Sequence, residues 1–276
     1  MALKTRLARI SMGAALLFVA IFGACSKSEQ PAANRTRPQS SPGKTPTTIG
    51  VYRPSNGTFY LRNSNSLGDP DMAVPFGPRD GMPLAGDWNG TGTAKIGIYK
   101  PDEGIFYLRN TNSAGDADVT VPFGPKRSVP IVGDWDGNGT VTIGAYDPEQ
   151  SVFYLRNSNS SGKPDLTILY GAKGDVPLVG DWDGNGTVTI GLYRPTASAF
   201  YLRNDNSPGS PDLTLVYGAN GDKPLAGDWD GDGITTIGVY RPNEMMFYLH
   251  NSESSDFIVR LGGAGDIPIV GKWAKN

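Results

Sequence analysis

A twelve-residue segment rich in aspartate, asparagine and glycine is the part of this sequence best equipped for chemistry. GDWDGNGTVTIG occurs at 133–144 and again, unchanged, at 180–191, and GDWDGDGITTIG follows at 227–238. Carboxylate and amide oxygens are the ligands that a hard cation such as Ca²⁺ prefers. The same side chains also accept hydrogen bonds from nearby backbone N–H groups and can hold a tight turn together without a metal. The segment alone leaves both interpretations open.

The acidic segments belong to a repeat of 47 residues. A Phe-Tyr pair recurs five times at this spacing, beginning at Phe59, and a second tyrosine does the same, beginning at Tyr52. Four tryptophans, beginning at Trp88, also keep the spacing, whereas Trp273 comes three residues early because the last copy has a shorter loop. The five copies cover residues 47–276, which we expect to form one domain.

Each copy contains four short segments with strand character, separated by turn sequences. In one copy these are 129–135, 142–147, 152–158 and 166–171, and side chains in them alternate with the period of two that strands show. Four strands per copy and a period in the forties predict an all-β fold, a five-bladed β-propeller. Packing blades around a ring buries sheet faces that a single sheet would expose. A β-solenoid is the alternative, although its rungs are generally shorter and its strands parallel.

The two ends of the repeat region predict how the ring closes. The region starts with TIGVY at 48–52, the second strand of a copy, and ends with IPIVGKW at 267–273, the first strand of a copy. One C-terminal strand would therefore complete a blade with three N-terminal strands. Lys272 stands at this junction where another copy has Asp134. Loss of the acidic residue is expected there, because a ring closed in this way has no loop at the junction.

The unit resembles the FG-GAP and VCBS repeat family, whose blades carry a calcium loop between the first two strands. In one copy the resemblance rests on Phe123-Gly124, the run from Gly133 to Gly139, Ile143-Gly144-Ala145 and Pro148, and it extends to every copy. Loops of this kind bind Ca²⁺ through positions 1, 3 and 5, the backbone carbonyl of position 7, and position 9. The resemblance implies calcium ligands at Asp134, Asp136, Asn138, Asp181, Asp183, Asn185, Asp228, Asp230 and Asp232.

Position 9 of the loop departs from the family pattern. Threonine stands in place of an acidic residue at Thr142, Thr189 and Thr236, and Lys95 stands there in the earliest loop. A lysine ammonium could replace the cation, so we expect the earliest loop to bind no metal. Calcium in the other loops should be weakly bound and structural, near the roughly 10⁻⁴–10⁻³ M of extracellular modules. The three carboxylates of Asp228–Asp232 make the last loop the best candidate.

Residues 1–24 have the pattern of a secretory signal peptide, a basic start followed by a short apolar core. The only cysteine, Cys25, follows Phe22-Gly23-Ala24 in a segment that resembles a bacterial lipobox, although the family pattern prefers Leu in place of Phe22. The resemblance implies an exported protein anchored to the membrane through acylated Cys25, and Ser26 favours the bacterial outer membrane. Residues 25–46, rich in Pro and Ser, are expected to form a disordered tether. Plain secretion is the alternative.

A second motif, Tyr followed by Arg and Pro, places an aromatic ring beside a cation in three copies. These residues are possible contacts for a ligand such as a sugar, and they are Tyr52, Arg53, Tyr193, Arg194, Tyr240 and Arg241. The competing interpretation is that each tyrosine packs between blades and each arginine pairs with a nearby aspartate. The formal net charge of −2 and the lack of a basic stripe argue against binding of nucleic acid.

An enzyme of glycosidase type would need two or three carboxylates in different environments, supplied by acids that break the repeat. The candidates are Glu103, Asp147, Glu149, Glu244 and Glu253, all in turn-like positions without visible partners. His250 only replaces an arginine in the register of the repeat. We therefore predict a monomeric, non-enzymatic cell-envelope module that binds a protein or glycan ligand or serves as a scaffold. A multivalent lectin is the first alternative, and a glycoside-acting enzyme is the second.

Overall fold

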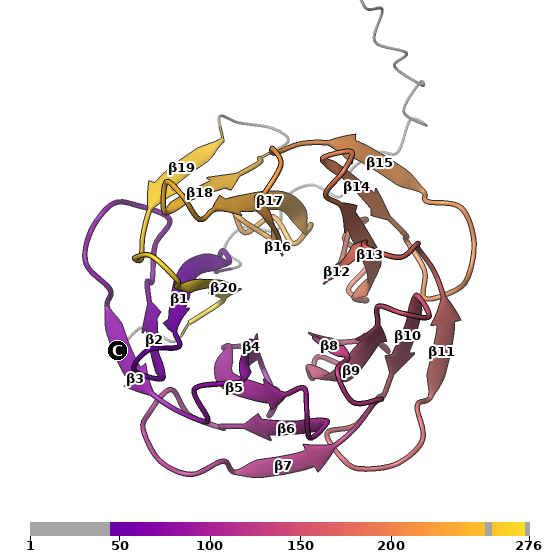
Figure 1. Cartoon of the computed structure of the whole chain (residues 1–276), viewed down its shortest axis with the longest axis horizontal. Helices are drawn as coiled ribbons and strands as arrows, with labels where there is room; N and C mark the ends of the chain where they lie inside the picture. The colour runs from indigo at the N-terminus through magenta and orange to yellow at the C-terminus, as the bar shows by residue number, and fades with distance from the viewer. Residues whose placement is uncertain (1–44, 252–255, 274–276) are drawn as a thin grey trace, which may run out of the picture. The chain divides into compact units, whose positions relative to one another are not determined.

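The computed structural model describes residues 45–251 and 256–273, and within these ranges the chain is all-β. Five antiparallel sheets of four strands are arranged around a ring, which is a five-bladed β-propeller (Figure 1). The prediction of the fold is therefore confirmed. The predicted signal peptide, Cys25 and the tether lie outside the described residues. Within the described part of the chain, no helix has the length and apolar character needed to cross a membrane.

The strands of every blade follow one another in order from the inside of the ring to its rim. Blade 1 consists of β20 (Ile267–Gly271), β1 (Thr48–Arg53), β2 (Thr58–Leu61) and β3 (Met72–Pro75). Blade 2 consists of β4 (Met82–Gly86), β5 (Lys95–Lys100), β6 (Ile105–Leu108) and β7 (Val119–Pro122). Blade 3 consists of β8 (Val129–Gly133), β9 (Thr142–Asp147), β10 (Val152–Leu155) and β11 (Leu166–Leu169). Blade 4 consists of β12 (Val176–Gly180), β13 (Thr189–Arg194), β14 (Ala199–Leu202) and β15 (Leu213–Val216). Blade 5 consists of β16 (Lys223–Gly227), β17 (Thr236–Arg241), β18 (Met246–Leu249) and β19 (Phe257–Arg260).

The hydrophobic core lies between neighbouring blades. Between blades 2 and 3, for example, Tyr99 and Phe106 of one blade pack in the same cluster as Ile143 of the next, and all three are fully buried. The rings of Tyr99 and Phe106 lie 4.5 Å apart in a tilted arrangement. Gly144 stands in the middle of β9 because a Cβ atom there would lie 2.9 Å from Ile131. Each blade thus depends on its neighbours for the burial of its apolar faces.

Blade 1 closes the ring by joining the two ends of the described chain. β20 pairs antiparallel with β1, with Gly50 opposite Ile269, and the hydroxyl of Thr48 donates to the carbonyl of Gly271 at 3.2 Å. The innermost strands contact one another in a complete circuit, from β4 through β8, β12, β16 and β20 back to β4. The predicted closure, one C-terminal strand with three N-terminal strands, is confirmed.

A backbone hydrogen bond also joins each blade to the next at position 1 of the acidic segment. The N–H of Val188 in blade 4 donates to the carbonyl of Asp134 in blade 3 at 2.9 Å. Equivalent bonds run from Val141 to Asp87, Thr235 to Asp181, Thr47 to Asp228 and Ala94 to Lys272, at 3.0, 2.7, 2.6 and 2.7 Å. Lys272 therefore retains the backbone contact of this position although the acidic side chain is lost.

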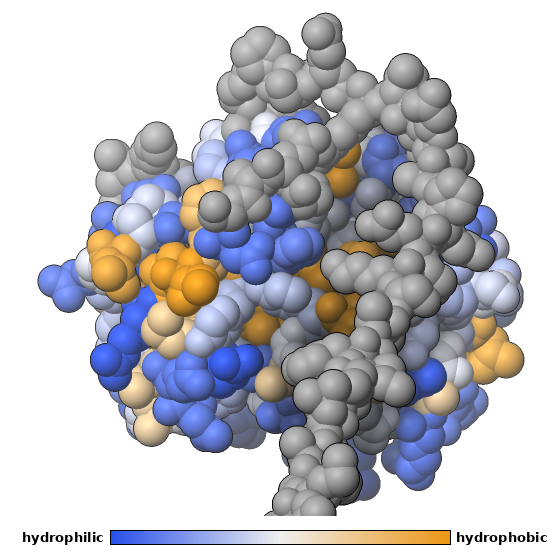
Figure 2. Space-filling view, turned by 90° about the horizontal axis from the view of Figure 1, so that it is seen from above, coloured by the Kyte–Doolittle hydropathy of each residue, from blue (hydrophilic) through white to orange (hydrophobic). Residues whose placement is uncertain are grey.

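The outermost strands differ between blades in how they meet solvent. Those of blades 1 and 2 end in Pro75 and Pro122, and proline cannot donate a hydrogen bond to a further strand. Those of blades 3 to 5 carry exposed apolar side chains, including Leu169, Val216 and Ile258, which are 64%, 78% and 56% exposed. Figure 2 shows one side of the molecule, on which such hydrophobic groups interrupt a mostly hydrophilic surface. Single exposed apolar side chains are common on protein surfaces and do not by themselves mark a binding site.

Ring closure yields the first testable prediction. Truncation after Asp266 removes β20 together with Ile269 and Trp273, which are 6% and 3% exposed. Since loss of one large buried side chain costs about 3–5 kcal/mol, we expect the free energy of unfolding to fall by more than about 5 kcal/mol. Chemical denaturation followed by tryptophan fluorescence measures this change.

The control is a circular permutant in which residues 267–273 precede residue 47, so that blade 1 becomes continuous. The permutant should retain nearly the stability of the natural order, because it keeps every strand pair. A truncated protein as stable as the full chain would show that closure by β20 does not hold the ring together.

Candidate functional site

The acidic loop of blade 3 is closed by its own hydrogen bonds. The two carboxylate oxygens of Asp134 accept from the N–H groups of Asn138 and Gly139 at 2.9 and 2.7 Å. Gly139 has a φ of 89°, a left-handed conformation that favours glycine. The loop of blade 4 repeats the arrangement with Asp181, whose carboxylate accepts from Asn185 and Gly186 at 3.0 and 2.8 Å. Burial raises the pKa of Asp181 despite these donors.

The threonine at position 9 of these loops hydrogen-bonds to the adjoining strand. The hydroxyls of Thr142 and Thr189 donate to the carbonyls of Gly133 and Gly180 at 3.2 and 3.1 Å. The contacts connect the first two strands of the blade, where an acidic residue would contribute to a metal site. The turn interpretation therefore accounts for these side chains, and the calcium interpretation for them stays a prediction.

The loop of blade 2 contains a lysine ammonium at the place expected for the cation. Nζ of Lys95 donates to the hydroxyl of Thr91 at 3.3 Å and to the carbonyl of Thr93 at 3.0 Å. These two oxygens occupy loop positions 5 and 7, which bind calcium in loops of this kind. Burial lowers the pKa of Lys95. The ammonium thus contacts two of the oxygens that a cation would use, and the absence of metal from this loop stays a prediction.

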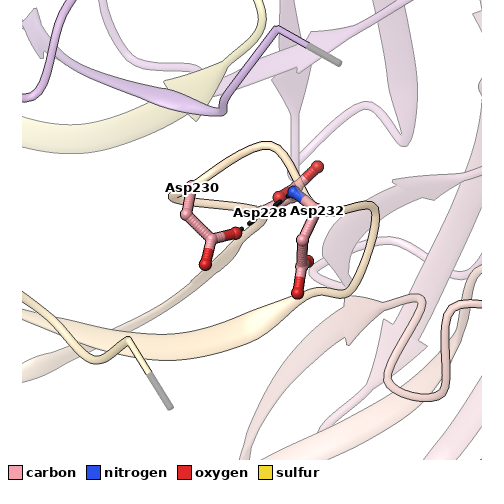
Figure 3. A group of neighbouring side chains, drawn as sticks. All are labelled: Asp228, Asp230 and Asp232. Atoms are coloured by element: carbon pink, nitrogen blue, oxygen red, sulfur yellow. Dashed lines mark hydrogen bonds between the residues drawn. The ribbon is translucent and has the colours of Figure 1, made fainter. Parts of the chain in front are cut away.

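The loop of blade 5 brings three carboxylates together. Oxygens of Asp228, Asp230 and Asp232 lie within 4.8 Å of one another, and a dashed line in Figure 3 marks the hydrogen bond from the N–H of Asp232 to Asp230. Nζ of Lys272, which follows β20, lies 3.0 Å from Oδ2 of Asp228. The amide of Asn251 donates to Asp230 at 3.0 Å. Three carboxylates are suitable donors for Ca²⁺, but a bound ion would share Asp228 with Lys272.

The tyrosines of the Tyr-Arg-Pro motifs are part of the core. Tyr52, Tyr193 and Tyr240 are at most 1% exposed, and each lies against the phenylalanine of the neighbouring strand. No ring face is open to a ligand at these three positions. The hypothesis of sugar stacking on these tyrosines is therefore wrong, and the interpretation that they pack between blades is confirmed.

The arginines of the same motifs pair with buried aspartates. Nε and Nη2 of Arg53 donate to the two carboxylate oxygens of Asp266 at 2.9 and 2.8 Å, and the aspartate side chain is 0% exposed. Arg194 pairs with Asp175, and Arg241 pairs with Asp222, in the same two-bond geometry. Hydrogen bonding to the aspartate raises the pKa of each arginine.

Each of the three guanidinium groups also lies over a partly exposed tyrosine ring. The carbon Cζ of Arg53 is 4.7 Å from the ring centre of Tyr60, and the pairs Arg194–Tyr201 and Arg241–Tyr248 have distances of 4.8 and 4.6 Å. We call each set of aspartate, arginine and tyrosine a platform. The three platforms are Asp266–Arg53–Tyr60, Asp175–Arg194–Tyr201 and Asp222–Arg241–Tyr248.

A pairing pattern in the sequence marks the platforms, although it was not used to predict the site residues. The aspartate directly before the innermost strand occurs only in the copies that have the arginine. In blade 2, where Lys100 replaces the arginine, the equivalent position is Gly81. In blade 3, where Asp147 replaces it, the position is Ser128. Joint loss of both partners is expected when a buried carboxylate is tolerated only with its cation.

Two clefts open between the outer parts of neighbouring blades. The cleft between blades 5 and 1 has a volume of about 420 Å³ and is lined by Arg53, Tyr60, Gly68–Pro70 and the segment from Arg260 to Gly262. The cleft between blades 1 and 2 has about 360 Å³ and is lined in part by Tyr107 and Gly115–Ala117. Tyr107 and Gly115 are the repeat equivalents of Tyr60 and Gly68. The two clefts are therefore copies of one feature of the repeat.

The arginines that follow the Phe-Tyr strands organise the loops beside the clefts. The guanidinium of Arg109 donates to the carbonyls of Ser113, Ala114 and Asp116 at 3.3, 3.1 and 2.7 Å. Arg62, Arg156 and Arg203 bind their own loops in related ways. In blade 5, His250 instead contacts Asp256 at 2.9 Å. The loops that line the clefts are thus held rigidly from within.

No family model and no curated protein matches this chain, so the resemblance to FG-GAP and VCBS repeats stays a prediction. Among solved structures, a lectin from Agrocybe aegerita, described as recognising non-reducing terminal N-acetylglucosamine, is similar with 16% identity and a TM-score of 0.40. The similarity covers 68% of this chain and 55% of the lectin chain, so this chain spans about half of the lectin's length.

The buried ion pairs yield the second prediction. In blade 4, Arg194→Gln should lower the free energy of unfolding by about 2–3 kcal/mol, because it leaves the buried carboxylate of Asp175 unpaired. Asp175→Asn should cost less, because the guanidinium that it leaves unpaired is 37% exposed and can be hydrated. The double variant should cost little more than the worse single variant. The exposed pair Lys173–Glu149, whose side chains are 75% and 74% exposed, is the control and should couple by less than about 1 kcal/mol. Additive effects at Asp175 and Arg194 would contradict the pairing.

Calcium binding yields the third prediction. For a dissociation constant of about 0.1 mM, 1 mM Ca²⁺ stabilises the fold by about 1.4 kcal/mol per loop. We expect Tm in 1 mM Ca²⁺ to exceed Tm in EGTA by about 3–5 °C. The double variant Asp230→Asn, Asp232→Asn should reduce this difference, whereas Asn89→Ser in the lysine-containing loop should not. Identical melts with and without Ca²⁺ would contradict the calcium interpretation.

Proposed function

We propose that this protein is a non-enzymatic binding module of the cell envelope, in which the lateral clefts between blades receive the ligand. The observation that supports it most is the recurrence of one cleft at two junctions, with equivalent lining residues. Volumes of about 420 and 360 Å³ are in the range of small-molecule sites. Export and anchoring through Cys25, predicted from the sequence, would hold the module at a membrane surface.

A saccharide is the ligand class that the clefts suit best. Each cleft combines one tyrosine with backbone and polar groups, and its loop is held in place by an arginine. Repeated sites on one rigid scaffold allow a chain of sugar units to bind at several points, which raises the overall affinity. The lectin alternative is thus a specific form of the proposed binding function, and the recurring clefts favour it.

Three of the acidic residues that break the repeat, Glu103, Asp147 and Glu149, have partners within the described part of the chain, whereas Glu253 lies outside it. Glu103 accepts from Lys100 at 2.6 Å and from Tyr107 at 3.2 Å. Glu149 pairs with Lys173, in the segment between β11 and β12, at 2.7 Å. Asp147 caps the turn after β9 by accepting from the N–H of Glu149 at 2.9 Å. These contacts support the proposal that the protein binds its ligand without transforming it.

The fourth prediction tests the clefts as the binding site. The full-length protein should bind a subset of saccharides on a glycan array, and Asp69→Trp with Thr120→Trp should weaken that binding at least tenfold. Both side chains line the clefts and are exposed, so tryptophan would fill the space without disturbing the core. Binding constants are measured by isothermal titration calorimetry with the best saccharide of the array.

The matched control is Thr167→Trp, the same strand position in blade 3, which lines neither of the two clefts. This variant should bind as the natural protein does. Undiminished binding by the cleft variants, or cleavage of the bound saccharide, would contradict the proposed function.

A further inference from the structure

The three platforms differ in one respect that bears on ligand chemistry. In each of them Nε and Nη2 of the arginine are taken by the buried aspartate, and one face of the guanidinium rests on the tyrosine. Nη1 and the second N–H of Nη2 therefore remain as the groups that can meet a ligand. In blade 5, Nη1 of Arg241 lies 3.5 Å from Oε1 of Glu244. Within the described ranges, no carboxylate pairs with Nη1 of Arg53 or Arg194.

The platforms differ in this way because the turn after each arginine carries a different residue at the position of Glu244. Glu244 is the fourth residue of the turn that begins at Arg241, and its N–H donates to the carbonyl of that arginine at 3.2 Å. The turns that begin at Arg53 and Arg194 have the same geometry, with Asn56 and Ala197 at the equivalent position, 3.3 and 3.1 Å from the arginine carbonyl. Neither side chain carries a negative charge, so these two platforms lack the internal carboxylate.

We propose that the platforms of Arg53 and Arg194 bind carboxylate groups of acidic saccharides, and that Glu244 occupies the equivalent position in blade 5 and closes it. This inference rests on the proposed saccharide-binding function and names its ligand class. The carboxylate of Glu244 serves as an internal example of the group that the platform accepts.

The physical properties of the platform suit such a ligand. The arginine is neutralised by its aspartate, so the platform attracts a carboxylate through directed, charge-assisted hydrogen bonds more than through net charge. The aspartate side chains are at most 1% exposed, whereas the side chains of Arg53 and Arg194 are 36% and 37% exposed. The guanidinium is held before the ligand arrives, which reduces the entropy lost on binding. Arg53 also lines the cleft between blades 5 and 1, which places the platform inside the proposed site.

The test uses two reciprocal substitutions at exposed turn positions, where little effect on folding is expected. Glu244→Ala should open the platform of blade 5, and Ala197→Glu should close that of blade 4. The side-chain Nε–H signals of the arginines are followed by NMR in the ¹⁵N-labelled full-length protein during titration with trigalacturonate. The fully methyl-esterified trisaccharide and sodium acetate are titrated in parallel at equal ionic strength.

In the natural protein, trigalacturonate should shift the signals of Arg53 and Arg194 and leave that of Arg241 in place. In Glu244→Ala the signal of Arg241 should respond as well, and in Ala197→Glu the signal of Arg194 should stop responding. The methyl ester should bind at least tenfold more weakly than the acid. An unresponsive Arg241 in Glu244→Ala, or equal binding of ester and acid, would overturn the inference.

The remaining outcomes separate this inference from the proposed function. If neutral saccharides shift backbone signals of the clefts while the arginines stay silent, the clefts bind sugar and the carboxylate inference fails. If no saccharide shifts any cleft signal, the proposed function fails too. Equal shifts with acetate and trigalacturonate, at equal carboxylate concentration, would show that no saccharide is recognised and would overturn the assignment of the ligand class.

Discussion

Mutual burial between neighbouring blades is the interaction on which this structure depends. A four-stranded blade has two apolar faces, and the clusters of buried side chains each draw residues from two blades. A blade at the end of an open row would leave one face in water, so a closed ring is the arrangement that satisfies all of them. The five equivalent backbone bonds at position 1 of the acidic segments add a directional link at every junction, including the two that involve blade 1. Closure also removes the need for special capping residues at the ends of the array.

The acidic segments acquire a different meaning in this setting. Their first residue links blades through its carbonyl, and its carboxylate holds the turn through two N–H groups. Both contacts are made to backbone groups of the protein. In blade 2 the ammonium of Lys95 lies among the loop oxygens, and in blade 5 the ammonium of Lys272 lies against the carboxylate of Asp228. A motif that looks like a calcium loop is thus also a structural joint. The backbone of Lys272, at position 1 in blade 1, therefore still accepts the hydrogen bond from blade 2, although the aspartate side chain has been lost there.

The sequence was sufficient for the fold because the fold is periodic. The number of blades follows from the regular spacing of aromatic residues and from the period-two alternation within each strand. The manner of closure follows from the division of one repeat between the two ends of the region. Both the number of blades and the closure were found as predicted. The site was harder to predict because it depends on which side of a strand faces solvent. The sequence marked Tyr52 as a ligand contact, but this ring is buried, and the partly exposed ring lies one strand further on, at Tyr60. The arginine–aspartate pairing was expected, whereas its stacking on a tyrosine of the adjacent strand needed the register of the sheet. The clefts needed three-dimensional coordinates altogether, since their walls come from different copies.

The pairing of β20 with β1 has a kinetic consequence. Thr48 and Gly271, which share a hydrogen bond, are 223 positions apart, so this contact forms among the first and last structured parts of the chain. Bringing such distant segments together carries an entropy cost of roughly 5 kcal/mol, estimated as (3/2)RT ln n. Contacts between such distant residues slow folding, because the entropy of closing the loop is lost before the contacts contribute favourable free energy. During synthesis from the N-terminus, the first three strands must wait for the last strand to emerge before their inner edge is covered. Closure of blade 1 can therefore occur only after the rest of the ring has been synthesised.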